Sequence, residues 1–216
     1  IKSVNWNGVL SDPGQQFQVC ISGPSYPTQP SCQFVGGNGG TLTWTDLIAG
    51  NYTVSEPNVG SEWQVDITNS PALVPVNGDK ATASITNTRK LATIEVTKVA
   101  DWNGIPVDPA QQFAICLSGP SFATAPGCER VGAYGGVVTW SNLIPGSYSV
   151  SENDPGTRWA TTISPSPVIA PADGGTATAT VTNTRKRGSL TLTKVANWNG
   201  VPEETAQQFT LCITGP

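Results

Sequence analysis

The stretch TIEVTKV, from Thr93 to Val99, has the alternating pattern of a β-strand but contains a lysine on the wrong face. In a strand, every second side chain points to the same side of the sheet. Ile94, Val96 and Lys98 therefore share a face that is otherwise apolar. Burying an ammonium group among apolar side chains is unfavourable unless it finds a partner. The pattern thus predicts a lysine that points into a protein core beside polar partners.

The same stretch recurs along the chain at a fixed interval of 96 residues. Lys98 corresponds to Lys2 and Lys194, and each lysine is followed four residues later by Trp-Asn-Gly. The interval also relates these sets: Trp6, Trp102 and Trp198; Phe17, Phe113 and Phe209; Cys20, Cys116 and Cys212; Cys32 and Cys128; Trp44 and Trp140; Trp63 and Trp159; Asn87 and Asn183. A unit of about a hundred residues is too long for a solenoid repeat and is typical of a small β-sandwich domain.

Short alternating segments bounded by Gly, Pro and Asn predict that each repeat is built of β-strands. In the second repeat the expected strands are 91–99, 111–118, 128–132, 136–140, 147–152, 159–163, 166–170 and 176–183. The segment SLTLTKVANWNG (Ser189–Gly200) is interpreted in the same way, as a strand that runs into a tight turn. So many short strands in one repeat imply two packed antiparallel sheets. The expected fold class is all-β, with tandem β-sandwich domains.

The repeat period sets the expected domain boundaries. Residues 1–89 form a repeat with a truncated first strand, 90–185 a complete repeat, and 186–216 the opening quarter of a third. Because few residues separate Asn87 from Lys98, successive domains are expected to abut end to end rather than hang on flexible tethers. Both ends fall inside a repeat, which indicates a window from a longer array. The alternative is a last quarter that serves as a donor strand for a neighbouring subunit.

The composition argues against several classes of function. Only 12% of the residues are charged, the net charge is −4 and no Lys/Arg run is longer than three residues, so no nucleic-acid partner is expected. The chain has no His, which removes the common hydrolase triads and most zinc sites. We therefore expect no cofactor, no metal and no enzymatic turnover. No apolar stretch is long enough to span a bilayer, and no signal peptide is visible.

Two further polar residues in each repeat lie on strand faces that are otherwise apolar. The segment SYSVSE places Glu152 in line with a Tyr and a Val, and TATATVTN places Asn183 in line with two Ala and a Val. The corresponding residues of the first repeat are Glu56 and Asn87. Each complete repeat therefore has one Lys, one acid and one Asn that point inward. These three must contact one another or destabilise the fold.

A lysine, an acid and an asparagine can react as well as pair. Burial disfavours the charged form of a lysine, so a neutral, nucleophilic amine becomes accessible. A neighbouring carboxyl group can polarise the Asn carboxamide and shuttle protons while the amine attacks and ammonia leaves. Such a reaction occurs once, because it depends on groups that the fold holds together. The pattern indicates either a Lys–Asn amide crosslink or a buried Lys–Glu ion pair with Asn hydrogen-bonded nearby.

The segments LIPGSYSVSENDPGTRW and LIAGNYTVSEPNVGSEW resemble the Leu-x-x-Gly-x-Tyr-x-x-x-Glu motif of CnaB-type domains, also called SpaA-like or prealbumin-like. The opening TIEVTKV and the closing TATVTNT resemble the lysine and asparagine strands of that family. The resemblance covers each whole repeat and implies Ig-like or transthyretin-like sandwiches, which build bacterial pilus shafts and adhesin stalks. Two features depart from the family: Trp63 and Trp159 stand where Tyr is usual, and each repeat has a cysteine pair.

The resemblance also implies a role for each inward polar residue. Two isopeptide bonds are expected, each with an assisting acid: Lys2–Asn87 with Glu56, and Lys98–Asn183 with Glu152. Lys194 would pair with an asparagine beyond the chain end. Each bond would join the first and last strands of a domain, where the chain enters and leaves, so that tension would bypass most of the domain.

The cysteines are spaced Cys-x11-Cys, which predicts one disulfide in each complete repeat. The expected pairs are Cys20–Cys32 and Cys116–Cys128, and Cys212 would pair beyond the chain end. Closing so short a loop stabilises a fold by about 3 kcal/mol. Repeated pairs in a chain of low charge favour an oxidising, extracellular setting at a cell surface. Buried free thiols are the alternative.

The tryptophans are expected to be structural. Trp44 and Trp140 share a strand face with apolar residues and are predicted to lie in the core. The Trp of each Trp-Asn-Gly turn is expected to pack over the turn or to contact a neighbouring domain, with a carbohydrate platform as the alternative.

Together these patterns predict a structural protein, the tandem-repeat shaft of an extracellular bacterial fibre, pilus-like filament or adhesin stalk. The expected partners are neighbouring repeats and identical chains. A module that binds a host, matrix or glycan ligand is the alternative, but near-identical repeats favour a shaft.

Overall fold

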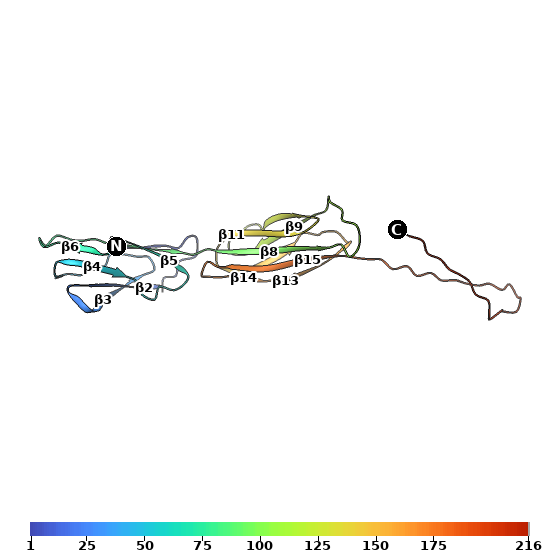
Figure 1. The fold of residues 1–216 in the computed structure, drawn as a ribbon, viewed down its shortest axis with the longest axis horizontal. Helices are drawn as coiled ribbons and strands as arrows, with labels where there is room; N and C mark the ends of the chain where they lie inside the picture. Colours follow the sequence, from blue (N-terminus) through green and yellow to red (C-terminus); the bar gives the residue numbers. More distant parts are fainter. Residues whose placement is uncertain (216) are drawn as a thin grey trace. The chain divides into compact units, whose positions relative to one another are not determined.

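The computed structural model describes residues 1–215, which contain fifteen β-strands and no helix (Figure 1). The chain divides into two compact units, the first spanning Ile1–Lys186 and the second beginning at Arg187. All fifteen strands lie in the first unit. The all-β fold class is confirmed, while the division into tandem domains stays a prediction. No helix in the described residues is long and apolar enough to cross a membrane.

Seven strands of residues 1–89 form two sheets, with orders β1-β7-β5 and β3-β2-β4-β6. Every neighbouring pair is antiparallel except β1 with β7, which run parallel. The strands are β1 (Lys2–Asn5), β2 (Gln16–Gly23), β3 (Tyr26–Gly36), β4 (Gly50–Ser55), β5 (Trp63–Thr68), β6 (Ala72–Val74) and β7 (Ser84–Arg89).

Eight strands of residues 92–185 also form two sheets, with orders β11-β8-β15-β13 and β10-β9-β12-β14. They are β8 (Ala92–Asp101), β9 (Gln112–Ser118), β10 (Gly127–Gly132), β11 (Gly136–Leu143), β12 (Gly146–Glu152), β13 (Trp159–Ser164), β14 (Val168–Ala170) and β15 (Thr176–Arg185). All eight strands expected from the sequence of the second repeat are therefore confirmed, with small differences at their ends.

The first and last strands of the second repeat are neighbours in one sheet. β8 pairs in parallel with β15, from Thr93 opposite Thr176 to Asp101 opposite Thr184. In this register Val181 lies opposite Lys98, so the residue two positions beyond Val181 lies on the same face as the lysine. β1 and β7 repeat the arrangement in the first repeat, where Lys2 lies opposite Ile85.

Each repeat buries its own apolar residues, as two packed sheets require. The core of the second repeat includes Ile94, Val96, Leu117, Tyr148 and Val181, all fully buried or nearly so. A separate cluster in the first repeat comprises Phe17, Val19, Val35, Trp63 and Ile85. Both cores consist of side chains that alternate along the strands, which confirms the β-sandwich predicted from the alternation. The prediction that both sheets are antiparallel is wrong for one sheet of each repeat, because its first and last strands run parallel.

The first repeat lacks part of one sheet. Residues 41–47 lie outside any strand, whereas the corresponding residues of the second repeat form β11. The last strand is also shorter: β7 begins at Ser84, which corresponds to residue 180, whereas β15 begins at Thr176. In the second repeat both segments pair with the first half of β8, and the positions that match 92–96 lie before residue 1. The predicted core position is therefore confirmed for Trp140, which is 8% exposed, but Trp44 is only half-buried.

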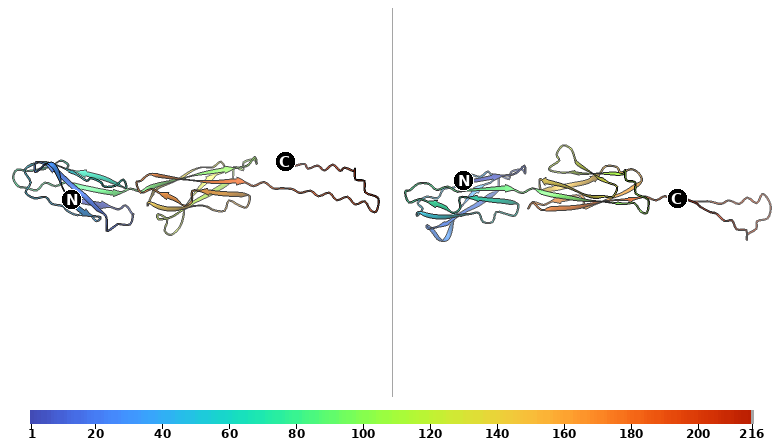
Figure 2. Two further views of the ribbon diagram at one scale, coloured as in Figure 1. Left: turned by 90° about the horizontal axis from the view of Figure 1, so that it is seen from below. Right: turned by 45° about the horizontal axis from the view of Figure 1, so that its top comes forward.

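Residues 187–215 form no strand, and their trace carries no arrow in either view of Figure 2. The strand predicted within Ser189–Gly200 is wrong, because a strand needs a hydrogen-bonded neighbour and none is present there. Leu190 and Leu192 are accordingly exposed. The predicted turn does form: Asn199 and Gly200 have positive φ, and the amide of Val201 donates to the carbonyl of Trp198.

Candidate functional site

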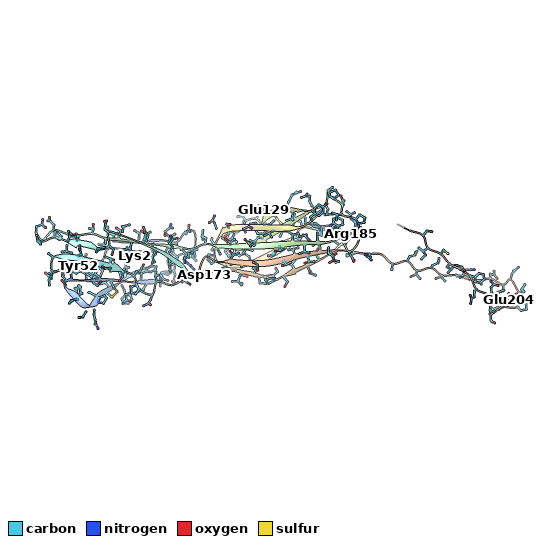
Figure 3. All side chains as sticks on the ribbon, in the orientation of Figure 1. Lys2, Tyr52, Glu129, Asp173, Arg185 and Glu204 are labelled. Atoms are coloured by element: carbon cyan, nitrogen blue, oxygen red, sulfur yellow. A yellow bond between two sulfur atoms is a disulfide. The ribbon has the colours of Figure 1, made fainter. Side chains whose placement is uncertain are left out.

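Each lysine that the sequence placed inward is buried in the structure. Lys98 is 2% exposed on β8. Lys2, which is labelled in Figure 3, is 4% exposed on β1. The alternation of β8 fixes this orientation, since Ile94 and Val96 on the same face are fully buried. The backbone of Gly135, with φ of 75°, lies so close to the carbonyl of Lys98 that no side chain would fit at residue 135.

In each repeat, the acid and the asparagine lie in or directly after two other strands. Glu56 follows β4 and Glu152 ends β12, and the side chains of both are 1% exposed. Asn87 on β7 and Asn183 on β15 are completely buried. In each repeat the acid therefore comes from one sheet, while the lysine and the asparagine come from adjacent parallel strands of the other.

In the first repeat, one carboxylate oxygen contacts both of the other groups. The Nζ of Lys2 donates to Oε1 of Glu56 at 2.6 Å, and the Nδ2 of Asn87 donates to the same oxygen at 3.1 Å. An acid in this place touches both the candidate nucleophile and the nitrogen that would leave. Proton transfer between them requires this geometry.

In the second repeat, the lysine and the acid lie farther apart than in the first. The Nζ of Lys98 lies 3.6 Å from Oε1 of Glu152 and donates instead to the carbonyl of Val99 at 3.0 Å. The hydroxyl of Thr161 donates to the other carboxylate oxygen of Glu152 at 3.1 Å. Sequence reasoning missed Thr161. The corresponding residue of the first repeat is Val65, so the threonine does not recur at the 96-residue interval as the other site residues do.

Unsatisfied polar atoms concentrate in these two clusters. Among the described residues, seven buried side-chain nitrogen or oxygen atoms have no hydrogen-bond partner, and five of them belong to Glu56, Asn87, Glu152 and Asn183. Both amide atoms of Asn183 are unpaired. A buried amide without partners costs roughly 1–3 kcal/mol. The surroundings of Asn183 are therefore poor for an intact carboxamide.

Burial lowers the pKa of both lysines. The pKa of Lys98 falls from 10.5 to about 8, because desolvation of the ammonium outweighs its attraction to Glu152. Desolvation also lowers the pKa of Lys2, against the hydrogen bond and the charge of Glu56. With a pKa of about 8, about one amine in ten is neutral at pH 7, which is enough to supply a nucleophile.

A phenylalanine ring lies beside each lysine, and sequence reasoning did not assign it to the site. The Nζ of Lys2 is 4.4 Å from the ring centroid of Phe17, and that of Lys98 is 4.2 Å from Phe113. Both rings are almost fully buried. The recurrence of these phenylalanines at the 96-residue interval was the one sequence feature that could have pointed to a role beside the lysines. The rings close the cluster to water and so contribute to the burial that lowers the lysine pKa.

Lys194, the third lysine of the series, is exposed, and its Nζ donates to the carbonyl of Val195 at 2.8 Å. It lies 4.3 Å from the ring of Phe209, so the lysine–phenylalanine contact recurs even where no sheet forms. Among the described residues, no acid or asparagine forms an ion pair or a hydrogen bond with Lys194.

The predicted disulfides are present. Cys20–Cys32 joins β2 to β3 and Cys116–Cys128 joins β9 to β10, in each case between residues directly opposite in the antiparallel ladder. Cys212 is free and exposed. The alternative of buried free thiols is thus wrong for the first two repeats.

The turn tryptophans pack within their own repeats. The ring of Trp102 meets that of Trp159 edge to face at 4.9 Å, and its Nε1 donates to the carbonyl of Ala133. Trp6 makes the same contacts with Trp63 and Gly37. This confirms the packing role, and Trp63 and Trp159, which depart from the family pattern, each supply the buried partner. No group of three potential metal ligands occurs in the described part of the chain.

The fold and the site define the class: a two-sheet β-sandwich with a buried Lys–Glu–Asn cluster at its first and last strands. No protein-family model matches the sequence, and no curated protein does. Among solved structures, the major pilin T-13 of Streptococcus pyogenes is 17% identical with a TM-score of 0.39, covering 86% of this chain and 95% of the pilin. The minor pilin GBS52 of Streptococcus agalactiae is 15% identical with a TM-score of 0.35, covering 86% and 88%. At these TM-scores and identities, neither similarity supports an argument about this chain.

Proposed function

We propose that this protein is a structural element of an extracellular bacterial fibre, the tandem-repeat shaft of a pilus-like filament or adhesin stalk. Intradomain isopeptide bonds between Lys2 and Asn87 and between Lys98 and Asn183 stabilise it, together with the two disulfides. The observation that carries the proposal is the buried Lys–Glu–Asn cluster between the first and last strands of each sandwich.

The proposed reaction is an amide exchange that needs no cofactor or oxidant. The neutral Nζ of the lysine attacks Cγ of the asparagine, and the bond from Cγ to Nδ2 breaks. The proton lost by the amine passes through the glutamate to the departing nitrogen, which leaves as ammonia. Oε1 of Glu56 contacts both nitrogens concerned, so the first repeat is arranged for this transfer.

A permanent ion pair is the alternative, and the unsatisfied atoms argue against it. A buried pair is stable only when further hydrogen bonds complete its environment. Here Oε1 of Glu152 and both amide atoms of Asn183 lack a hydrogen bond. Amide formation removes the ammonium charge of Lys98 and the Nδ2 of Asn183 from the core. It also provides an amide N–H that can donate a hydrogen bond to the glutamate.

The consequence of such bonds is mechanical. Each joins the strand by which the chain enters a sandwich to the strand by which it leaves. A disulfide in each repeat and a chain with few charges suit an oxidising environment outside the cell. A covalently closed sandwich resists stretching and proteolysis, which are demands on a shaft rather than on a catalyst.

Intact mass spectrometry of the full chain under denaturing conditions tests the proposal. Each isopeptide bond removes one ammonia, about 17 Da, so the two proposed bonds should lower the mass by two ammonia, in addition to the hydrogens lost to the two disulfides. Fragmentation of a protease digest should then give branched peptides that contain Lys2 with Asn87 and Lys98 with Asn183. An unmodified mass would overturn the proposal.

A further inference from the structure

Thr161 on β13 is a fourth polar residue of the cluster in the second repeat, and the proposed reaction gives it no role. β13 lies next to β15, and Thr161 is directly opposite Asn183 in the antiparallel ladder. Directly opposite side chains point to the same face of a sheet. Thr161 therefore lies beside the carboxamide that would react, and its hydroxyl donates to Oε2 of Glu152 at 3.1 Å.

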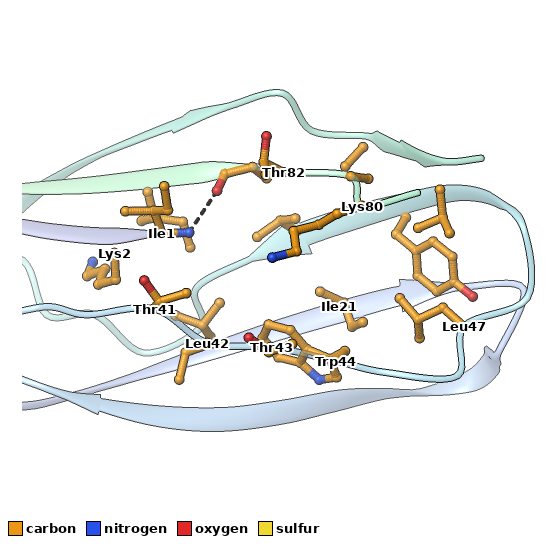
Figure 4. A pocket seen from close by; sticks show the side chains of 18 residues that line it. Ile1, Lys2, Ile21, Thr41, Leu42, Thr43, Trp44, Leu47, Lys80 and Thr82 are labelled. Carbon is orange, nitrogen blue, oxygen red and sulfur yellow. Dashed lines mark hydrogen bonds between the residues drawn. The ribbon is translucent and has the colours of Figure 1, made fainter. Parts of the chain in front are cut away.

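The first repeat has a residue without a hydroxyl at this position. Val65 on β5 is directly opposite the asparagine of that cluster, in the same register. Lys2 and Leu42 line one pocket of the first repeat, so this lysine also lies beside apolar side chains (Figure 4). The two acids therefore differ at one group: Oε2 of Glu56 has no hydrogen-bond partner, whereas Oε2 of Glu152 accepts from the threonine.

The threonine hydrogen bond opposes the part that the glutamate has in the reaction. A hydrogen bond from a hydroxyl favours the charged form of a carboxyl group. The glutamate must accept the proton of the amine before it passes this proton on, so the bond works against the first transfer. With this bond in place, Oε1 of Glu152 lies 3.6 Å from the Nζ of Lys98 and has no hydrogen bond. In the first repeat, Oε1 of Glu56 contacts both nitrogens.

We propose that Thr161 is a positioning residue that slows isopeptide formation in the second repeat through its hydrogen bond to Glu152. This inference rests on the proposed function, because it concerns the rate of the same reaction. Thr161 is exposed on the edge strand of its sheet, while the side chain of Glu152 is 1% exposed. Replacing the threonine therefore changes the surroundings of the carboxylate without opening a cavity in the core.

The time course of crosslinking in the full chain tests the inference. The chain is synthesised in a short cell-free pulse under oxidising conditions, synthesis is stopped, and samples are denatured in acid at successive times. After reduction and digestion, the fraction of branched peptide that contains Lys98 and Asn183 gives the progress of the second repeat. The branched peptide of the first repeat, which contains Lys2 and Asn87, is an internal reference for synthesis and folding in the same sample.

Thr161→Val should speed crosslinking in the second repeat about tenfold, because the loss of a hydrogen bond to a charged group changes a rate by that order. Thr161→Ser keeps the hydroxyl and should react at the parent rate, which a packing effect would not explain. Thr162→Val is the matched control: Thr162 is the next residue of β13 and points to the opposite face, so both rates should be unchanged. The reciprocal change, Val65→Thr, should slow the first repeat about tenfold.

The outcomes separate this inference from the proposed function. If both branched peptides form but Thr161→Val reacts at the parent rate or more slowly, the inference is overturned and the crosslinks stand. A Thr161→Ser variant that reacts as fast as Thr161→Val, or a first repeat that Val65→Thr does not slow, overturns it as well. Absence of both branched peptides at every time overturns the proposed function, and this inference with it.

Discussion

Replacing Lys98 with Met and Glu152 with Gln together separates a crosslink from an ion pair. Either substitution alone is ambiguous, because removing one partner of a buried pair leaves the other charge uncompensated and costs about 3–5 kcal/mol. The double variant removes both charges and keeps similar side-chain volumes. If the cluster were only an ion pair, the change would be neutral or stabilising, by up to about 4 kcal/mol.

A lost crosslink has the opposite sign. Lys98 and Asn183 are 85 positions apart, and a covalent link that closes a loop of that length restricts the unfolded chain by about 4–5 kcal/mol. For a domain of this size, each kcal/mol shifts the melting temperature by about 4–8 °C. The second repeat of the double variant should therefore melt about 20–35 °C lower than in the parent.

Differential scanning calorimetry of the full chain measures this shift, with the intact mass taken on the same sample. The first repeat keeps its own cluster and serves as an internal reference, and the variant should show one ammonia loss in place of two. Lys194→Met is the matched control, since Lys194 is exposed and its replacement should leave the transitions of residues 1–186 unchanged. A double variant that melts with the parent or above it would refute the crosslink.

In Asn183→Ala, where Lys98 stays an amine, the free energy of unfolding should rise by up to about 3 kcal/mol between pH 8 and 10.5. The unfolded chain binds a proton in that window that the folded chain does not, and a flat urea-titration profile would contradict the lowered pKa. Glu152→Gln should abolish one of the two ammonia losses, while Thr161→Val should retain both, because the first repeat has valine there; intact mass decides. Thiol titration should find one thiol, Cys212, before reduction and five after it, and reduction should destabilise each sandwich by about 3 kcal/mol.

Period-two alternation and the 96-residue interval were sufficient to predict the strands of the second repeat and the inward direction of its polar residues. Ile94, Val96 and Lys98 share a face because of the pleat alone, so their burial needed no knowledge of neighbouring strands. The disulfides followed from spacing and recurrence. These features are local, or repeat along the chain, and the sequence therefore contains them directly.

Features that depend on which strands become neighbours could not be predicted from the alternation. The parallel pairing of β8 with β15 brings Asn183 beside Lys98, and only the resemblance to a family implied it. Trp44 and Leu190 have the same pattern as buried residues elsewhere, yet neither is fully buried, because burial requires a strand to cover them. The hydrogen bond from Thr161 to Glu152 likewise depends on β13, which lies next to β15.

The position of the proposed crosslink decides which part of a sandwich bears tension. β8 and β15 run parallel, so pulling on the start of one and the end of the other shears the whole ladder between them. A bond from Lys98 to Asn183 passes the load from residues 92–98 directly to residues 183–185. Residues 99–182 are then bypassed, and with them the Cys116–Cys128 disulfide. The two kinds of covalent bond would therefore have different roles: the disulfide opposes local unfolding, and the proposed isopeptide bond would oppose extension.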